Sequence, residues 1–297
     1  MNTILNSYLQ HLCGAENVFQ NVPLSTKTTF RIGGAAKFFV TVRTKETLVK
    51  LVSALNFIEE KFFIIGNGSN VLAPDEGYDG VVIKCAFADI VQNGNFVYAD
   101  AGVSLGRLCA YAREHGLGGL EWACAIPATV GGAVYMNAGA HGGSVADSCV
   151  CVDVFVGDVK TITADKLGFS YRTSIFQRRK KWIITGAYFY LKQDKLEEIA
   201  KREDDFRRLR ASRLPTQPSA GSTFRRPFDD FYVGKVVEEL GLKGKKEGGA
   251  QISDKHAGVI VNAGGATKAD VMKLVNLVKK KVRDKHGVNL KLEYEEL

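Results

Sequence analysis

Apolar residues recur at two spacings along the chain, and each spacing predicts a different element. Within residues 45–61, apolar side chains return at intervals of three and four, which places them on one face of a helix. The next four residues, 62–65, are all apolar and predict a short buried strand. The predicted helix is followed directly by the predicted strand, and a glycine turn ends this αβ pair. The predicted apolar face of the helix consists of Leu48, Leu51, Val52, Leu55 and Ile58.

The same two patterns predict the other elements. Strands are expected at 81–84, 95–100, 150–156 and 182–191, and helices at 104–115, 195–213, 233–240 and 267–285. Ser104 is the predicted N-cap of one helix, and Thr267 with Asp270 makes a capping-box-like start of the last. Prolines and a Ser-Ala-Gly-Ser turn after residue 213 predict a domain boundary. Because helices and short strands alternate, the expected class is α+β.

Composition excludes a disordered chain and a membrane-spanning one. The 297 residues are 45% apolar, enough to fill a core, and 24% charged, enough to keep the surface in water. Every window of eighteen residues contains polar or helix-breaking residues. The first ten residues have no basic segment before an apolar run, so we expect no secretory signal and a cytosolic location. The six cysteines have no metal-ligand spacing, and we expect reduced core residues and no metal.

Positive charge is concentrated in the last third of the chain. The net charge is +8, and residues 201–297 hold 21 basic and 14 acidic residues, a balance of +7. These charges alternate in sign, and no helix-turn-helix or aromatic platform motif accompanies them, so we expect no nucleic-acid partner. A solvated helix face and a phosphorylated small ligand are the two explanations that we keep.

Two glycine-rich segments are candidates for a bound ligand. Residues 66–70 (GNGSN) follow a predicted strand, and successive N–H groups of such a turn can enclose a phosphate. The segment is not a dinucleotide fingerprint, because Val71 replaces the third glycine, and a plain Asn-Gly turn is the alternative. Residues 125–140 are small and cannot fill a core alone. A bulky flat partner beside them is favoured over a close contact between helices.

Seven motifs in this order resemble those of UDP-N-acetylenolpyruvoylglucosamine reductases. They are TTFRIGGAAKF (28–38), IGNGSNVL (65–72), AGVSLG (101–106), AIPATVGGAVYMNAGA (125–140), FSYRTSIF (169–176), SAGSTFRRP (219–227) and GGAQISDKHAGVIVN (248–262). The resemblance covers about residues 23–293. It implies an FAD-dependent oxidoreductase that uses NADPH to reduce UDP-N-acetylglucosamine enolpyruvate to UDP-N-acetylmuramate, a precursor of peptidoglycan.

The resemblance also implies the fold. We expect a two-part FAD-binding region of the vanillyl-alcohol-oxidase/PCMH-like type, residues 1–75 and 76–204. A C-terminal α/β substrate domain, residues 205–287, should follow. The strand 288–297 is expected to join the second FAD-binding part. The protein is expected to be a monomer, and NADPH and the UDP-sugar should enter one cleft in turn.

Site residues follow from the same motifs. Arg172 would polarise the substrate carboxylate, Ser222 would protonate C2, and Glu293, with Glu295 as the alternative, would stabilise the developing charge. Substrate would also be bound by Tyr171, Arg213, Gln217, Arg225 and Lys235. Non-covalent FAD would contact Arg31, Gly33, Gly34, Gly66, Asn67, Gly68, Ser69, Asn70, Gly102, Pro127, Thr129, Gly131, Gly132, Asn137 and Gly139.

Each catalytic candidate has a structural alternative when the residues are considered alone. Arg172 can be a surface ion-pair partner, Ser222 a helix cap or turn residue, and Glu293 an exposed terminal acid. Two other functions also fit the glycine motifs. One is a flavin-dependent oxidase of the same fold, and the other is a flavin or nucleotide binder without activity.

Overall fold

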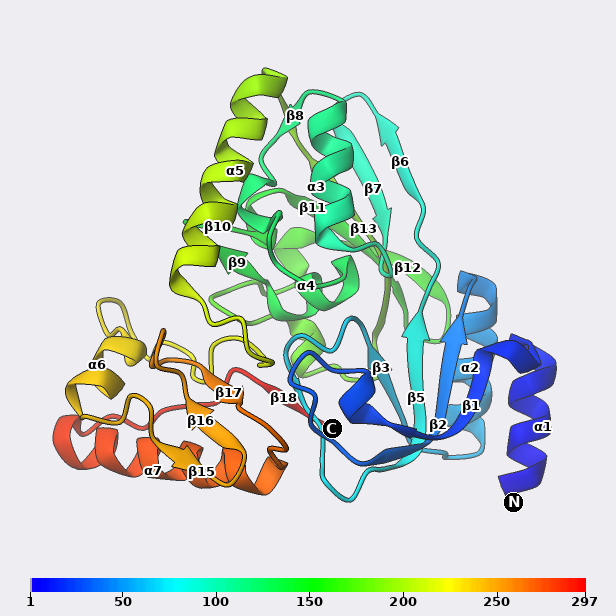
Figure 1. Ribbon diagram of the computed structural model, residues 1–297. Coiled ribbons are helices and arrows are strands. Elements are labelled where there is room, and N and C mark those ends of the chain that lie inside the picture. The colour runs from blue at the N-terminus through cyan, green and yellow to red at the C-terminus, as the bar shows by residue number, and fades with distance from the viewer. Residues whose placement is uncertain (1) are drawn as a thin grey trace. The chain divides into compact units, whose positions relative to one another are not determined.

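The computed structural model describes residues 2–297, which divide into two compact units. Unit 1 contains the residues up to 19 together with 39–67 and 81–210, and unit 2 contains 20–38, 68–80 and 211–297. The α-helices, labelled in Figure 1, are α1 (Asn2–Cys13), α2 (Lys45–Phe57), α3 (Leu105–Glu114), α4 (Val130–Met136), α5 (Leu196–Arg213), α6 (Val233–Glu239) and α7 (Lys268–His286).

The strands are mostly short. They are β1 (Val18–Pro23), β2 (Ala35–Val42), β3 (Phe62–Ile65), β4 (Val71–Leu72), β5 (Tyr78–Cys85), β6 (Ile90–Asn93), β7 (Phe96–Asp100), β8 (Leu117–Gly118), β9 (Gly139–Ala140), β10 (Gly143–Ser144), β11 (Cys149–Phe155), β12 (Val159–Thr163), β13 (Ile183–Tyr190), β14 (Lys192–Gln193), β15 (Lys246–Glu247), β16 (Ala250–Ile252), β17 (Ile260–Asn262) and β18 (Glu295–Glu296). Single turns of 3₁₀-helix lie at Ala15–Asn17, Leu24–Thr26, Glu121–Ala123, Val145–Asp147, Ala164–Lys166 and Ile175–Gln177.

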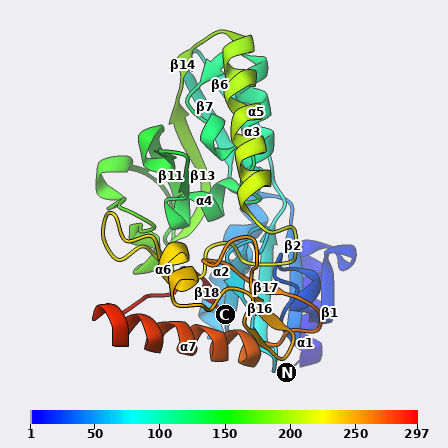
Figure 2. The same cartoon turned by 60° about the vertical axis from the view of Figure 1, so that its left-hand side comes forward.

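Unit 1 is built on an antiparallel five-stranded sheet in the order β12-β11-β13-β7-β6. The alternation predicted for 150–156 buries Val152 and Val154 on this sheet. Helices α3 and α5 lie side by side in both views (Figures 1 and 2). Between them the Glu203 carboxylate, 1% exposed, accepts hydrogen bonds from Arg113 at 2.7 Å and Arg207 at 2.9 Å. Both bonds reach Oε2, whereas Oε1 is buried without a hydrogen-bond partner among the described residues, so they offset only part of the cost of burying this carboxylate.

Helix α2 follows the predicted apolar pattern up to its last turn. Thr44 is the N-cap, and its hydroxyl accepts a hydrogen bond from the N–H of Thr47 at 3.1 Å. The four predicted face residues inside the helix are fully buried. Ile58 was wrongly included: the helix ends at residue 57 and Ile58 is 53% exposed. The reason is that Glu59 adopts a left-handed φ of 55°, which no continuing helix allows.

A further sheet has four strands in the order β1-β2-β5-β3. Its strands β3 and β5 pair in parallel, with Phe62 opposite Val81 and Ile65 opposite Lys84.

In unit 2, α7 packs against β15, β16 and α6 (Figures 1 and 2). The predicted capping box is present: the hydroxyl of Thr267 accepts from the N–H of Asp270 at 3.1 Å, and the Asp270 carboxylate accepts from the N–H of Thr267 at 3.2 Å. Gly287 ends the helix in a left-handed conformation. The face that α7 buries consists of Val271, Leu274, Val275, Val278 and Val282.

The C-terminal strand differs from the prediction. Within the expected strand 288–297, residues 288–294 form only an isolated bridge between Leu292 and Phe224, and β18 begins at residue 295. Backbone groups of 291 and 293 bond instead to the segment 223–225. Strand β18 pairs in parallel with β4, at residues 71–72, and so with the expected first FAD-binding part rather than the second. The three-part division itself stays a prediction.

All six cysteines are free thiols, four of them buried and two half-buried. Burial raises the pKa of Cys85 and Cys149 to about 12, so these thiols are protonated at neutral pH. No helix within residues 2–297 is both long enough and apolar enough to span a bilayer.

The start of α7 gives the first testable prediction. Hydrogen bonds from backbone N–H groups lower the pKa of Asp270, so its carboxylate stabilises the folded state. We expect Asp270→Asn to lower the free energy of unfolding by about 0.5 kcal/mol at pH 7. The loss should be full above the unfolded pKa of about 3.9 and shrink as the pH falls through the lower folded pKa. Urea titrations of both proteins between pH 3 and pH 7 measure it.

Asp284, in the last turn of the same helix, is the matched control. A negative charge is unfavourable at that end of the helix dipole, so Asp284→Asn should leave stability unchanged or raise it slightly. A loss for Asp270→Asn that is equal at pH 3 and pH 7 would contradict the prediction.

Candidate active site

The loop 66–70 presents a run of backbone donors between β3 and β4. The protein provides no hydrogen-bond acceptor for the five N–H groups of this loop within residues 2–297. The carbonyl groups, in contrast, fix the loop: that of Gly68 accepts from the N–H of Thr29 at 3.1 Å, and that of Asn70 from the N–H of Glu295 at 2.8 Å. Consecutive N–H donors fit an anionic group such as the pyrophosphate of FAD. The predicted phosphate-binding loop is therefore chemically suited to the cofactor.

Most glycines predicted to border the cofactor are already required by the packing of the protein. A β-carbon added at seven of them would come within 3.0 Å of another atom. At Gly68 that atom belongs to the backbone of residues 27–28, and Gly68 itself has a left-handed φ of 62°. These seven are Gly33, Gly34, Gly66, Gly68, Gly102, Gly131 and Gly139. At Gly132 the nearest atom is the hydroxyl of Thr129, at an ordinary 3.5 Å. Gly132 is thus the one position of the eight where a β-carbon would make only an ordinary contact.

The first backbone N–H groups of α4 already donate to acceptors within the protein. The N–H groups of Val130 and Gly131 donate to the carbonyls of Val103 and Ala101 at 2.8 and 2.9 Å. The N–H of Gly132 donates to the hydroxyl of Thr129, which is buried as the N-cap of this helix. This segment therefore offers a ligand a small-residue surface and not a set of backbone donors.

Arg172 lies at the tip of a tight hairpin in unit 1. Ser170 and Thr173 exchange both backbone hydrogen bonds, at 3.1 and 3.0 Å, so the turn consists of Tyr171 and Arg172 alone. Arg172 has a left-handed φ of 53°. Its guanidinium donates to the carbonyl of Gly139 at 2.8 Å and stacks over the ring of Tyr171, which is 47% exposed.

Ser222 and Glu293 belong to unit 2, where a backbone hydrogen bond links Glu293 to the residue that follows Ser222. The N–H of Glu293 donates to the carbonyl of Thr223 at 3.0 Å. Ser222 is exposed, starts no helix, and its hydroxyl has no hydrogen-bond partner in the described part of the chain. The helix-cap alternative for Ser222 is therefore wrong. The exposed-acid alternative for Glu293 is wrong too, because this residue is only 9% exposed.

Four of the residues predicted to bind substrate lie in varied surroundings in unit 2. Arg213 is the last residue of α5, and Gln217 is exposed in the loop after it. Arg225 is half-buried, and its backbone N–H donates to the backbone carbonyl of Lys291. Lys235 is 77% exposed and lies 3.9 Å from Glu239 on the same helix.

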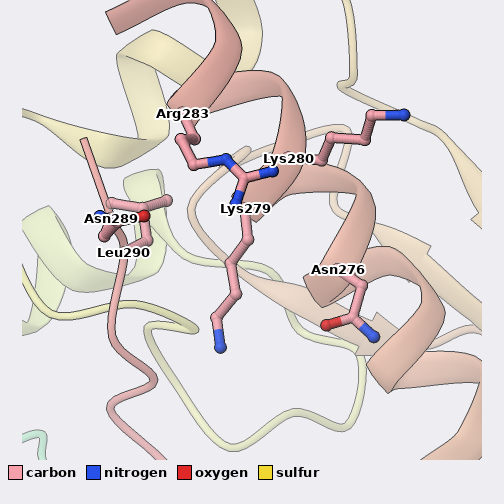
Figure 3. A pocket seen from close by; sticks show the side chains of 6 residues that line it. All are labelled: Asn276, Lys279, Lys280, Arg283, Asn289 and Leu290. Atoms are coloured by element: carbon pink, nitrogen blue, oxygen red, sulfur yellow. The ribbon is translucent and has the colours of Figure 1, made fainter. Parts of the chain in front are cut away.

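A cavity of about 220 Å³ lies elsewhere in unit 2, beside α7 (Figure 3). Lys279 points between the helix and the segment 289–290, whereas Lys280 points away. None of the predicted substrate residues lines this cavity, and only the +7 balance of the last third gave any signal of it. It is lined by Asn276, Lys279, Lys280, Arg283, Asn289 and Leu290.

Comparisons with known proteins agree with the motif order. Residues 214–297 match the family model "UDP-N-acetylenolpyruvoylglucosamine reductase, C-terminal domain", and residues 36–165 match "FAD binding domain". The UDP-N-acetylenolpyruvoylglucosamine reductase of Thermotoga maritima is 45% identical over 275 residues, which is 92% of this chain and 96% of that protein.

Solved structures agree as well. The crystal structure of UDP-N-acetylenolpyruvylglucosamine reductase from Thermus caldophilus aligns with a TM-score of 0.81 and 36% identity, over 93% of this chain and 98% of that one. An alkyldihydroxyacetonephosphate synthase aligns with a TM-score of 0.50 at 14% identity, over 64% of this chain and 40% of that one, a likeness in fold alone. The predicted α+β class, with an FAD-binding region of the PCMH type and a C-terminal domain, is confirmed. With these similarities spanning more than nine-tenths of its length, the chain belongs to the UDP-N-acetylenolpyruvoylglucosamine reductase family.

Proposed function

We propose that this protein reduces UDP-N-acetylglucosamine enolpyruvate to UDP-N-acetylmuramate, with FAD as cofactor and NADPH as reductant, in the synthesis of peptidoglycan precursors. The observation that carries this proposal is the 45% identity to a reductase of this name across 92% of the chain. The match to an FAD binding domain over residues 36–165 supports the cofactor. A cytoplasmic monomer is the proposed form, in keeping with six free thiols.

The residues of the loop 66–70 would hold the FAD pyrophosphate through their backbone N–H groups. Gly132, with the buried Thr129 beneath it, would lie against the cofactor with no side chain between them. When bound, FAD supplies the redox relay between NADPH and the enolpyruvyl double bond. Most of the other glycines proposed to line the FAD contribute by letting neighbouring segments pack closely around these two.

Arg172 is suited to the substrate carboxylate. Reduction of the adjacent double bond places negative charge on C2, and this charge delocalises into the carboxylate as an enolate. A planar guanidinium can bind both carboxylate oxygens and stabilise that charge as it develops. The hairpin fixes the backbone position of Arg172, and the hydrogen bond to the Gly139 carbonyl restricts the direction of the guanidinium before substrate binds.

Ser222 would protonate C2. Its exposed hydroxyl has no hydrogen-bond partner among residues 2–297, so it can approach a substrate without breaking a hydrogen bond seen there. Glu293 would stabilise the charge from its buried position, and its backbone bond to Thr223 keeps it close in the fold to the residue after Ser222. Glu295, which is half-buried and pairs with Val71, is the weaker candidate. Basic side chains such as Arg213 and Arg225 would bind the substrate phosphates.

Gly132 tests the cofactor assignment without damaging the fold. Because a β-carbon there meets only the Thr129 hydroxyl at 3.5 Å, Gly132→Ala should fold normally and gain helix propensity. We expect Gly132→Ala and then Gly132→Val to lose bound FAD progressively, measured as the flavin-to-protein absorbance ratio after purification. Gly106, in the first turn of α3, has similar room for a β-carbon, and Gly106→Ala is the matched control. Full flavin content in both Gly132 variants would remove this surface from the FAD site.

Arg172 is tested by separating the two half-reactions. Arg172→Lys keeps the charge but loses the planar pair of donors, so flavin reoxidation by the UDP-sugar should slow by about 10² or more while reduction by NADPH changes little. Stopped-flow flavin absorbance measures both steps. Arg178→Lys, an exposed arginine of the same segment, is the control. Equal losses in both steps would assign Arg172 a folding role instead.

Ser222 is tested by comparing stability with turnover. Since its hydroxyl makes no hydrogen bond within the described chain, Ser222→Ala should change the free energy of unfolding by less than about 0.5 kcal/mol. Turnover should fall by about 10² to 10⁴, and Ser222→Cys should recover part of the loss because a thiol also donates a proton. Reduction of FAD by NADPH should survive in all variants. Ser219→Ala is the neighbouring control, and normal turnover in Ser222→Ala would exclude Ser222 as the proton donor.

A further inference from the structure

We infer that Asn137, expected from the motifs to contact FAD, is a positioning residue that fixes the direction of Arg172. The inference rests on the proposed function, because Arg172 matters only if it binds the substrate carboxylate. Asn137 and the Arg172 hairpin are 33 residues apart in the chain but are joined directly in unit 1.

Both ends of the Asn137 amide are used inside the protein. Its Nδ2 donates to the carbonyl of Ser170 at 2.9 Å, and its Oδ1 accepts from the N–H of Ala146 at 3.0 Å. The side chain is only 5% exposed. Asn137 also ends α4 in a left-handed conformation with a φ of 43°, which asparagine tolerates better than most residues. Its amide therefore connects three segments of the chain.

The Ser170 carbonyl closes the hairpin that carries Arg172. It accepts from Asn137 and also from the N–H of Thr173 at 3.0 Å. A second bond from the protein holds the turn itself, because the Gln177 side chain donates to the carbonyl of Arg172 at 3.0 Å. A left-handed φ at a non-glycine residue such as Arg172 persists only when its surroundings enforce it. Asn137 supplies part of that enforcement from outside the hairpin.

The same short segment also holds the guanidinium. Gly139, two residues after Asn137, accepts the hydrogen bond from Arg172 at 2.8 Å. The base of the hairpin and the tip of the Arg172 side chain are thus attached to one piece of chain, 137–139. Loss of the Asn137 bond would let the turn relax and separate these two attachments, so the guanidinium would no longer be directed toward one place.

The test uses Asn137→Asp in the FAD-bound enzyme. The carboxylate keeps the acceptor for Ala146 but replaces the donor to Ser170 with a second acceptor, which repels that carbonyl. We expect flavin reoxidation by the UDP-sugar to slow by about 10- to 100-fold at pH 8, whereas flavin content and reduction by NADPH stay near their original values. Lowering the pH protonates the carboxyl and restores a donor, so reoxidation should recover in this variant and show no such rise in the unmodified enzyme.

A second measurement does not depend on turnover. Hydrogen exchange at the Thr173 amide, in enzyme without substrate, should be at least about 10-fold faster in Asn137→Asp, because that amide closes the hairpin. Asn21, which also has a left-handed φ but is exposed in β1, gives the matched control Asn21→Asp. If Asn137→Asp does not fold, Asn137→Gly keeps the left-handed backbone and should show slow reoxidation without recovery at low pH.

A double-mutant cycle separates this inference from the proposed function. If Asn137 acts through Arg172, adding Asn137→Asp to Arg172→Lys should cost far less than it costs alone. Fully additive losses, or equal loss of flavin and of reduction by NADPH, would overturn the inference and return Asn137 to the cofactor. Faster exchange with unchanged reoxidation would overturn it as well. If Arg172→Lys itself leaves reoxidation unchanged, the role of Arg172 in the proposed function fails, and the exchange result still reports whether Asn137 holds the hairpin.

Discussion

Where a neighbouring segment occupies the space that a β-carbon would need, only glycine fits, and unit 1 contains several such contacts. Gly102 lies against the carbonyls of Phe87 and Cys85, Gly131 against Ala101, and Gly66 against the hydroxyl of Thr129. Together these contacts fix the end of β3, the turn after β7 and the start of α4. Glycine richness in this region is therefore first a property of the fold. The surface that a flat ligand can use is a consequence of that packing.

Unit 2 depends on a buried hydroxyl in a comparable way. The Thr223 side chain contacts the Tyr294 hydroxyl at 2.8 Å and accepts from the N–H of Ile260 at 3.1 Å. Its backbone bonds to Gly258 on one side and to Glu293 on the other. A buried polar group with all of its partners satisfied specifies one arrangement of the chain. The exposed Ser222 thus directly precedes a residue whose side chain and backbone are both held by hydrogen bonds.

Local patterns in the sequence were sufficient for the elements that local physics determines. The apolar face of α2, the Ser104 N-cap and the capping box of α7 all involve residues within a few positions of one another. The same reasoning failed at Ile58, because the left-handed Glu59 ends the helix. The C-terminal strand expected from the resemblance differs for another reason: residues 291 and 293 bond to the distant segment 223–225.

The candidate site shows the same limit. The motif order identified the family and suggested the site residues, but no local pattern indicates that Asn137 is joined to Ser170. The cavity beside α7 brings Asn289 next to residues of the helix across the turn after Gly287, and charge counting alone gave no individual residue. Pairings between remote positions depend on the assembled fold, which periodicity does not encode.

The burial of the cysteines has a practical consequence for chemical labelling. Burial raises the pKa of all six thiols, so the reactive thiolate is scarce in each at neutral pH. A thiol introduced at an exposed position would react with maleimides ahead of the native ones. In Ser222→Cys that thiol lies at the proposed proton-donating position, and its alkylation rate with and without the UDP-sugar would measure how far bound substrate covers residue 222.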